Sequence, residues 1–97
     1  MTAPRTILVI GATGQVGHVV VEEALARSLR VRAQSRNAAR ATTLLPADAE
    51  VVEASPTDAA SLAGIIDGVD IVILTHGGDS DLENHYYAVL PALLDAL

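Results

Sequence analysis

Residues 7–17 read ILVIGATGQVG, and this stretch determines how the rest of the chain can fold. Its apolar first half is too short for an ordinary helix and is typical of a buried β-strand. Three glycines follow at intervals of three residues, Gly11, Gly14 and Gly17, and a helical pattern continues from them. A helix that begins on a glycine-rich turn directs unpaired backbone N–H groups and the positive end of its dipole at the space above the turn. The stretch therefore predicts a strand, a tight turn and a helix that together bind a pyrophosphate.

Length and composition restrict the classes of protein to which the chain can belong. Ninety-seven residues are enough for a single domain with a modest core, and we expect that domain to span residues 1–97. Hydrophobic residues make up 51% of the chain, which indicates a globular protein. Because aromatic residues are nearly absent, Val, Ile, Leu and Ala must form the core, as is typical of parallel strands covered by helices.

Charge and residue usage exclude further classes. The net charge of -6 argues against a nucleic-acid partner. The chain contains no cysteine, so disulfides and thiolate metal sites are excluded. The sequence starts without a signal-peptide pattern, and no apolar stretch approaches the roughly 20 residues that a membrane helix needs. We therefore expect a cytoplasmic protein with no membrane partner.

Four apolar segments alternate with helical patterns along the chain. We expect strands over residues 6–10, about 31–35, 49–53 and 69–74. Helices are expected over residues 15–28, 37–45, 55–67 and 82–97. The even spacing requires right-handed crossovers and a parallel sheet with strand order 3-2-1-4. The prediction is an α/β fold of three layers, a doubly wound sheet built from four βα units.

The same patterns predict helix faces and helix ends. One face of the first helix is expected to pack on the sheet through Val16, Val19, Val20 and Ala24. Asn37 is expected to cap the second helix. Ser55 is expected to cap the third, with Asp58 completing a capping box.

The second and fourth strands differ in character. The second, RVRAQS, is polar, which suggests that it lies nearer the solvent than the first. The fourth is continuous and β-branched, which suggests a central place in the sheet. In the order 3-2-1-4, however, its outer edge has no partner. We expect either a homo-oligomer formed across this edge or further chain that completes the sheet.

The glycine spacing carries a resemblance to a known family. GATGQVG follows G-x-x-G-x-x-G and resembles the fingerprint of extended and atypical short-chain dehydrogenase/reductases, whose NAD(P)-binding domains have the Rossmann fold. The similarity is greatest to the NmrA-like branch and its NAD(P)H-binding and sugar-epimerase-like members. It continues through VRAQSR, EVVEASPTDAASL and GVDIVIL. The chain thus resembles the amino-terminal portion of a longer family fold.

Within this resemblance each glycine has a role. Gly11 permits the turn, Gly14 lets the backbone approach the pyrophosphate, and Gly17 lets the helix press against the strand. The cofactor would also be lined by Thr13, Gln15 and Val16. The alternative is a purely structural turn, but a glycine turn between a buried strand and an amphipathic helix is the context that dinucleotide binding requires.

The end of the second strand selects the nucleotide. A carboxylate there would accept hydrogen bonds from the 2′-hydroxyl of NAD, whereas an arginine accommodates a 2′-phosphate. Residues 31–40 contain no acid but include Ser35, Arg36 and Arg40. We therefore favour NADP(H) over NAD(H). The alternative is that Arg32, Arg36 and Arg40 are simply solvated.

Two further groups of residues complete the predicted cofactor site. Ser55 stands where the resembled family usually has Asp beside the adenine, and it either bonds the adenine or only caps the third helix. Thr75, His76 and Gly77 follow the fourth strand, where open α/β sheets bind ligands, and are expected towards the nicotinamide.

No catalytic or metal-binding residue can be assigned. The three histidines lack the spacing of metal ligands. Short-chain enzymes commonly use Tyr-x-x-x-Lys, and this chain has no lysine, so Tyr86 and Tyr87 are expected to pack or meet a partner.

The resemblance implies the cofactor-binding part of an oxidoreductase or epimerase that acts on a small-molecule substrate at full length. We expect these 97 residues alone to bind dinucleotide without turnover. A non-catalytic NADP(H) sensor of the NmrA-like kind is the alternative, and a degenerate domain that binds nothing well is the third.

Overall fold

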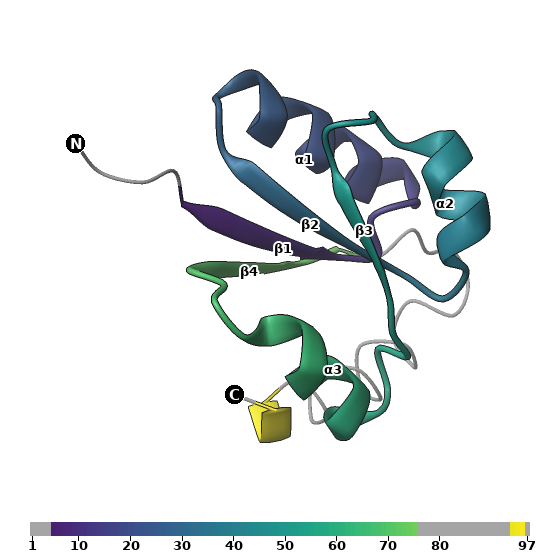
Figure 1. Cartoon of the computed structure of the whole chain (residues 1–97), viewed down its shortest axis with the longest axis vertical. Helices are drawn as coiled ribbons and strands as arrows, with labels where there is room; N and C mark the ends of the chain where they lie inside the picture. Colours follow the sequence, from purple (N-terminus) through teal and green to yellow (C-terminus); the bar gives the residue numbers. More distant parts are fainter. Residues whose placement is uncertain (1–4, 76–93, 97) are drawn as a thin grey trace.

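Four parallel strands form one sheet in the computed structural model, which describes residues 5–75 and 94–96. The elements are β1 (Thr6–Ile10), α1 (Gln15–Ala26), β2 (Arg30–Ser35), α2 (Ala38–Leu44), β3 (Glu50–Glu53), α3 (Ala59–Ile66) and β4 (Ile71–Leu74). The strand order is β3-β2-β1-β4 (Figure 1). The predicted α/β class and strand order are confirmed.

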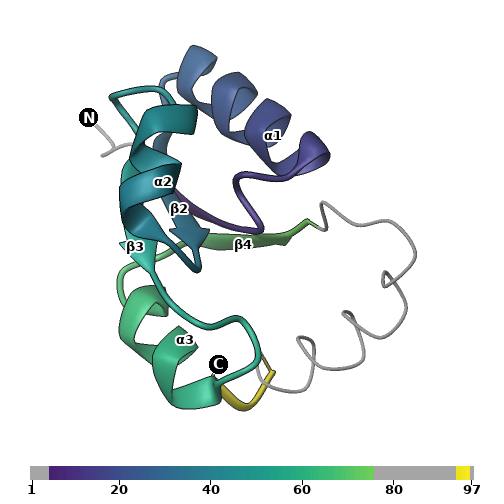
Figure 2. The same ribbon diagram turned by 90° about the vertical axis from the view of Figure 1, so that its right-hand side faces the viewer.

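Helices cover both faces of the sheet, so the described part of the chain has three layers. Figure 2 shows α1 and α2 on one side of the strands and α3 on the other. Ile7 and Val9 of β1 pack in the core under α1 and α2, whereas Leu8 and Ile10 pack in the core against α3. Successive side chains of a strand point to opposite faces, so a strand buried on both sides is a continuous apolar run.

The expectation that β2 lies nearer the solvent than β1 holds only at the start of the strand, where Arg30 is exposed and Arg32 is half-buried, whereas residues 7–10 of β1 are all buried. This strand pairs with β1 on one side and β3 on the other. Its last three residues, Ala33, Gln34 and Ser35, are all buried. Polar side chains are tolerated there because they are hydrogen-bonded, and the Gln34 amide bonds the backbone of two neighbouring segments.

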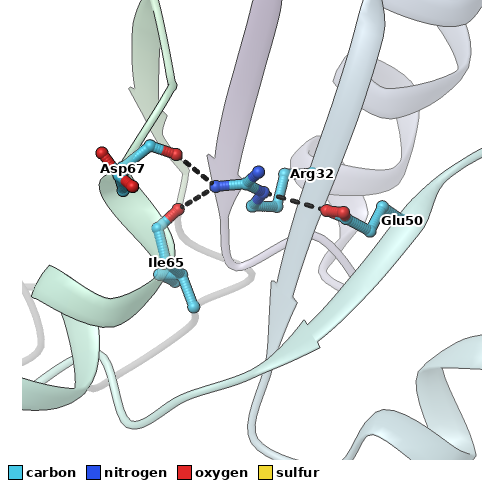
Figure 3. A network of polar contacts seen from close by, with 4 residues as sticks. All are labelled: Arg32, Glu50, Ile65 and Asp67. Atoms are coloured by element: carbon cyan, nitrogen blue, oxygen red, sulfur yellow. Dashed lines mark hydrogen bonds and ion pairs between the residues drawn. The ribbon is translucent and has the colours of Figure 1, made fainter.

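Arg32 of β2 joins three elements on the α3 side of the sheet (Figure 3). Its Nε donates to Glu50 Oε1 of β3 at 3.0 Å. One terminal nitrogen donates to the carbonyl oxygens of Ile65 at 2.7 Å and Asp67 at 2.9 Å, at the end of α3. Arg32 is therefore a structural residue of the sheet, which separates it from the other arginines near β2.

The fourth strand, β4, is one of the two outer strands of the described sheet and not a central one. It pairs with β1 through Ile7 and Ile71 at one end and Ile10 and Leu74 at the other. No strand within residues 5–75 and 94–96 pairs with its other edge, and Ile71 is exposed. Pairing of this edge with a second copy or with further chain stays a prediction.

The face that α1 buries agrees only in part with the expected one, since Ala24 is buried and Val20 packs against the core, but the other two valines do not. Val16 and Val19 are 55% and 53% exposed, whereas Gly17, Val21 and Ala24 are buried. The reason is Gly17, which has no side chain and lies directly against the turn, so that its face, not the valine face, meets the sheet. The glycine, and not the sum of apolar side chains, sets the rotation of the helix.

One expected helix cap is confirmed and one is wrong. Asn37 caps α2, because its side-chain oxygen accepts from Arg40 N at 3.0 Å. The cap of α3 is Asp58, whose Oδ1 accepts from Ala60 N at 3.1 Å, and not Ser55. Residues 55–58 instead form a turn closed by Asp58 N and Ser55 O at 3.3 Å. Both residue types are good caps, but the carboxylate also interacts favourably with the helix dipole.

The expected helix over residues 82–97 lies outside the described residues except for 94–96, which are helical. Tyr86 and Tyr87 also lie outside them. None of the helices in the described ranges is long and apolar enough to cross a membrane.

Candidate functional site

The turn after β1 adopts a conformation that requires glycine at its first position. Gly11 has a φ of +83°, and a Cβ added to it would lie 2.6 Å from Thr75 O. L-residues with side chains rarely adopt this backbone conformation, and the carbonyl leaves no room for one. Gly14 N donates to Gly11 O at 3.1 Å and closes the turn.

Gly17 brings the first turn of α1 into direct contact with the same backbone. A Cβ added to Gly17 would overlap the carbonyl oxygen of Gly11 and the Cα of Ala12. Only glycine allows the helix to begin this close to the strand, which is the geometry that dinucleotide-binding turns need.

The start of α1 is suited to an anionic ligand. Gly14 is the N-cap, with no side-chain cap bond, and no acidic residue lies in the first helical turn. Within the described ranges, no hydrogen bond involves the backbone N–H groups of Gln15, Val16 or Gly17. Thr13, Gln15 and Val16 are exposed beside these donors. The residues present therefore fit a pyrophosphate, which would accept hydrogen bonds from the backbone donors.

Thr75 holds the end of β4 against the turn. Its Oγ1 donates to Ile10 O at 2.7 Å and lies 3.2 Å from Gly11 O, and its backbone N also bonds Ile10 O. The side chain is 5% exposed. Thr75 thus holds the start of the glycine turn through these bonds. His76 and Gly77 lie outside the described residues.

An open pocket lies at the carboxyl ends of β2 and β3. This pocket, called the Arg36 pocket below, has a volume of about 400 Å³ and is lined by Arg36, Glu53, Ala54, Ser55 and Ser61. The fold thus brings together two predicted site residues, Arg36 and Ser55, that are far apart in the sequence. Ser55 N donates to Ser61 Oγ at 3.0 Å, which holds the pocket wall to α3. The sequence alone does not predict a role for Ser61 and Glu53, because nothing in a linear sequence shows that they line the same pocket.

Ser35 and Arg40, the other two residues predicted at the end of the second strand, do not line this pocket. Ser35 Oγ accepts from Asn37 N at 3.1 Å and shapes the segment that carries Arg36. Arg40 lies exposed in the first turn of α2 and does not line the pocket.

Gln34 is a residue of this region that the sequence analysis missed. It is 2% exposed; its Oε1 accepts from Gly11 N at 2.9 Å, and its Nε2 donates to Ala54 O at 2.7 Å. The signal that could have found it is an uncharged polar residue at the end of an inner strand.

A family comparison agrees with this geometry. Residues 11–96 match the model of the NAD(P)H-binding family. The chain belongs to this family. Its sheet is that of an NAD(P)-binding Rossmann domain, and the resemblance to such domains is confirmed. A nicotinamide dinucleotide is therefore the ligand class that the NAD(P)H-binding domain takes.

Solved structures share the fold. A Burkholderia pseudomallei protein named as an exported protein is 32% identical, with a TM-score of 0.78, and the match covers 95% of this chain and 41% of that one. An oxidoreductase from Lactococcus lactis is 22% identical, with a TM-score of 0.73, over 94% of this chain and 42% of its own. A candidate epimerase from Bacteroides thetaiotaomicron is 23% identical, with a TM-score of 0.76, over 97% and 42%.

The chain spans less than half the length of each of these three solved proteins. No curated protein matches it.

Proposed function

We propose that the NAD(P)H-binding domain prefers NADP(H) to NAD(H). The observation that carries this proposal is Arg36, which lines the open pocket beyond β2. The start of α1 would hold the pyrophosphate, and the pocket would take the adenosine end, with the guanidinium beside the 2′-phosphate. An arginine can form two parallel charge-assisted bonds to such a phosphate.

The surroundings of Arg36 support this role. No residue in the described part of the chain forms an ion pair with it. The pocket contains one acid, Glu53, and its Oε1 accepts from Ala38 N at 3.0 Å, at the beginning of α2. This carboxylate therefore already serves a structural purpose, whereas the acid that would bind the ribose of NAD is absent from β2.

An Arg36→Ala variant is expected to bind NADPH about tenfold more weakly, because it loses a charge-assisted contact at a solvent-accessible site. Binding of NADH is expected to change less than about twofold, since NADH has no 2′-phosphate. Isothermal titration calorimetry with both cofactors measures the difference.

Arg27→Ala is the matched control. Arg27 is the exposed residue that follows α1 at its C-terminal end, its described ion pair is with Glu23, and its loss should affect neither cofactor. Equal losses for NADPH and NADH in Arg36→Ala would remove the preference for NADP(H). A wild-type protein that binds neither cofactor at millimolar concentration would remove the proposal altogether.

We further propose that the domain serves an oxidoreductase or epimerase acting on a small molecule. The supporting observation is the fold shared with a named oxidoreductase and a candidate epimerase. The nicotinamide would supply the hydride chemistry, and the residues described above would bind and orient it. An NADP(H) sensor would need the same binding step, so a substrate-dependent change in NADPH absorbance is the observation that separates the two roles.

A further inference from the structure

Gln34 is a buried polar side chain for which the proposed function gives no role. It lies on β2, on the face that packs against α3, and its amide touches two separate parts of the site. The acceptor Oε1 bonds Gly11 N, which begins the glycine turn. The donor Nε2 bonds Ala54 O, which belongs to the lining of the Arg36 pocket.

The backbone of Gln34 adds a third contact. Its carbonyl oxygen accepts from Ala12 N at 3.3 Å. Gln34 therefore engages two successive N–H groups of the turn, one through its side chain and one through its main chain. These two donors are fixed by the protein, which leaves those at the start of α1 for the ligand.

The amide group suits this position for a chemical reason. One end of the side chain must accept a hydrogen bond and the other must donate one, and glutamine does both without a charge. A buried N–H or C=O group that loses its partner is costly, so the two bonds resist relative movement of the turn and of Ala54, the residue that follows β3. Apolar residues of the same length would fill the space but could not hold either group.

We propose that Gln34 is a positioning residue that fixes the glycine turn relative to the Arg36 pocket. A dinucleotide must reach both places at once, so a fixed separation pre-organises the site for it. Gln34 does not touch the ligand; it acts through Gly11 and Ala54. This inference rests on the proposed placement of the cofactor across both places.

The first test replaces Gln34 with methionine, which has a similar length and no amide. Gln34→Met is expected to weaken NADPH and NADH alike, by about tenfold, because both cofactors span the turn and the pocket. This pattern differs from Arg36→Ala, which should affect NADPH alone. Calorimetry measures both affinities, and thermal melting measures the accompanying loss of stability.

Val31→Ala is the control for a merely structural effect. Val31 is buried on the same strand but packs in the core on the opposite face, under α1 and α2. Its truncation should lower the melting temperature while leaving cofactor affinity unchanged. Wild-type affinity in Gln34→Met, or an equal loss of affinity in Val31→Ala, would overturn the inference.

A second variant, Gln34→Glu, tests the donor requirement through pH. A protonated carboxyl group can accept from Gly11 N and donate to Ala54 O, whereas the ionised group faces the Ala54 carbonyl without a donor. Burial raises the pKa of such a carboxyl above its usual value of about 4.3. Affinity and stability should therefore be near wild type at low pH and fall as the pH rises through that raised pKa.

Other ionisable groups on the α3 side of the sheet also contribute to the pH dependence of binding and stability. They include Arg32, Glu50, Asp58 and Asp67 and, on the helical residues 94–96 whose Ala96 packs on this face, Asp95. None of these side chains bonds the Gln34 amide. All are present in wild type too, so the ratio of variant to wild-type affinity for NADP+ isolates the introduced carboxyl. Parallel pH profiles for the two proteins would overturn the inference.

The outcomes separate this inference from the proposed function. No binding of any dinucleotide by the wild type overturns both. Wild-type binding that Gln34→Met leaves unchanged overturns only the positioning role. Selective loss of NADPH in Gln34→Met would contradict a role shared by both cofactors.

Discussion

Gly17→Ala is expected to destabilise the protein by about 3 kcal/mol and to abolish measurable dinucleotide binding. The added methyl group would overlap the carbonyl oxygen of Gly11, a backbone atom that no side-chain rotation can move away. The helix must then separate from the turn, which moves the N–H groups at the start of α1 from the position in which they bind phosphate. Urea unfolding and calorimetry with NADPH measure the two effects.

Gly64→Ala is the matched control, since it makes the same chemical change in another helix. Gly64 lies in α3, and no atom beyond its chain neighbours and the adjacent backbone of the same helix would come within 4 Å of its added Cβ. Alanine is the better helix former, so this variant should gain about 0.5–1 kcal/mol and bind NADPH like wild type. A Gly17→Ala protein that unfolds and binds as wild type does would show that helix and turn are not in the close contact described.

The sequence predicts the sheet well because its signals are local and redundant. The first strand is an unbroken apolar run, and the observed β1 has the predicted bounds, Thr6–Ile10. The positive φ of Gly11 can be predicted in the same local way, because a glycine at a tight turn between a strand and a helix indicates a backbone conformation that other residues rarely adopt. The strand order follows from spacing and handedness, and neither depends on any single side chain.

The parts that sequence reasoning misses depend on contacts between distant segments. Val16 and Val19 fit an apolar face by spacing, but the rotation of α1 is set by its contact with Gly11. Ser55 and Asp58 are both good caps, and the choice between them depends on how the chain leaves β3. Gln34 could only be interpreted once Gly11 N and Ala54 O were known to lie at its two ends.

The Arg36 pocket shows the same limit within the candidate site. The place of Arg36 after the second strand predicts its role, and a family position predicts that of Ser55. That both line one pocket follows from the parallel pairing of β2 with β3, which places their carboxyl ends side by side. Glu53 lines the pocket because it ends β3, which pairs with β2, and Ser61 lines it from α3.

Arg32→Met is expected to destabilise the protein by about 2–3 kcal/mol, the second large effect. The guanidinium bonds a carboxylate on β3 and two carbonyl oxygens at the end of α3, as Figure 3 shows. Its side chain is only 23% exposed, so water can replace these bonds only in part. The positive charge also lies at the negative end of the α3 dipole. Methionine keeps most of the aliphatic length and leaves the three acceptors unpaired, which urea unfolding measures.

Arg27→Met separates this network from an ordinary surface ion pair. Arg27 bonds Glu23 at 2.9 Å, slightly closer than Arg32 bonds Glu50, but its side chain is 72% exposed. An exposed pair of this kind contributes less than about 0.5 kcal/mol and weakens further in salt. The loss in Arg32→Met should persist at high salt, because two of its three acceptors are neutral carbonyl groups whose bonds do not depend on long-range charge. Equal and salt-sensitive losses in the two variants would show that Arg32 acts only as a surface charge and that α3 is held to the sheet by its apolar face alone.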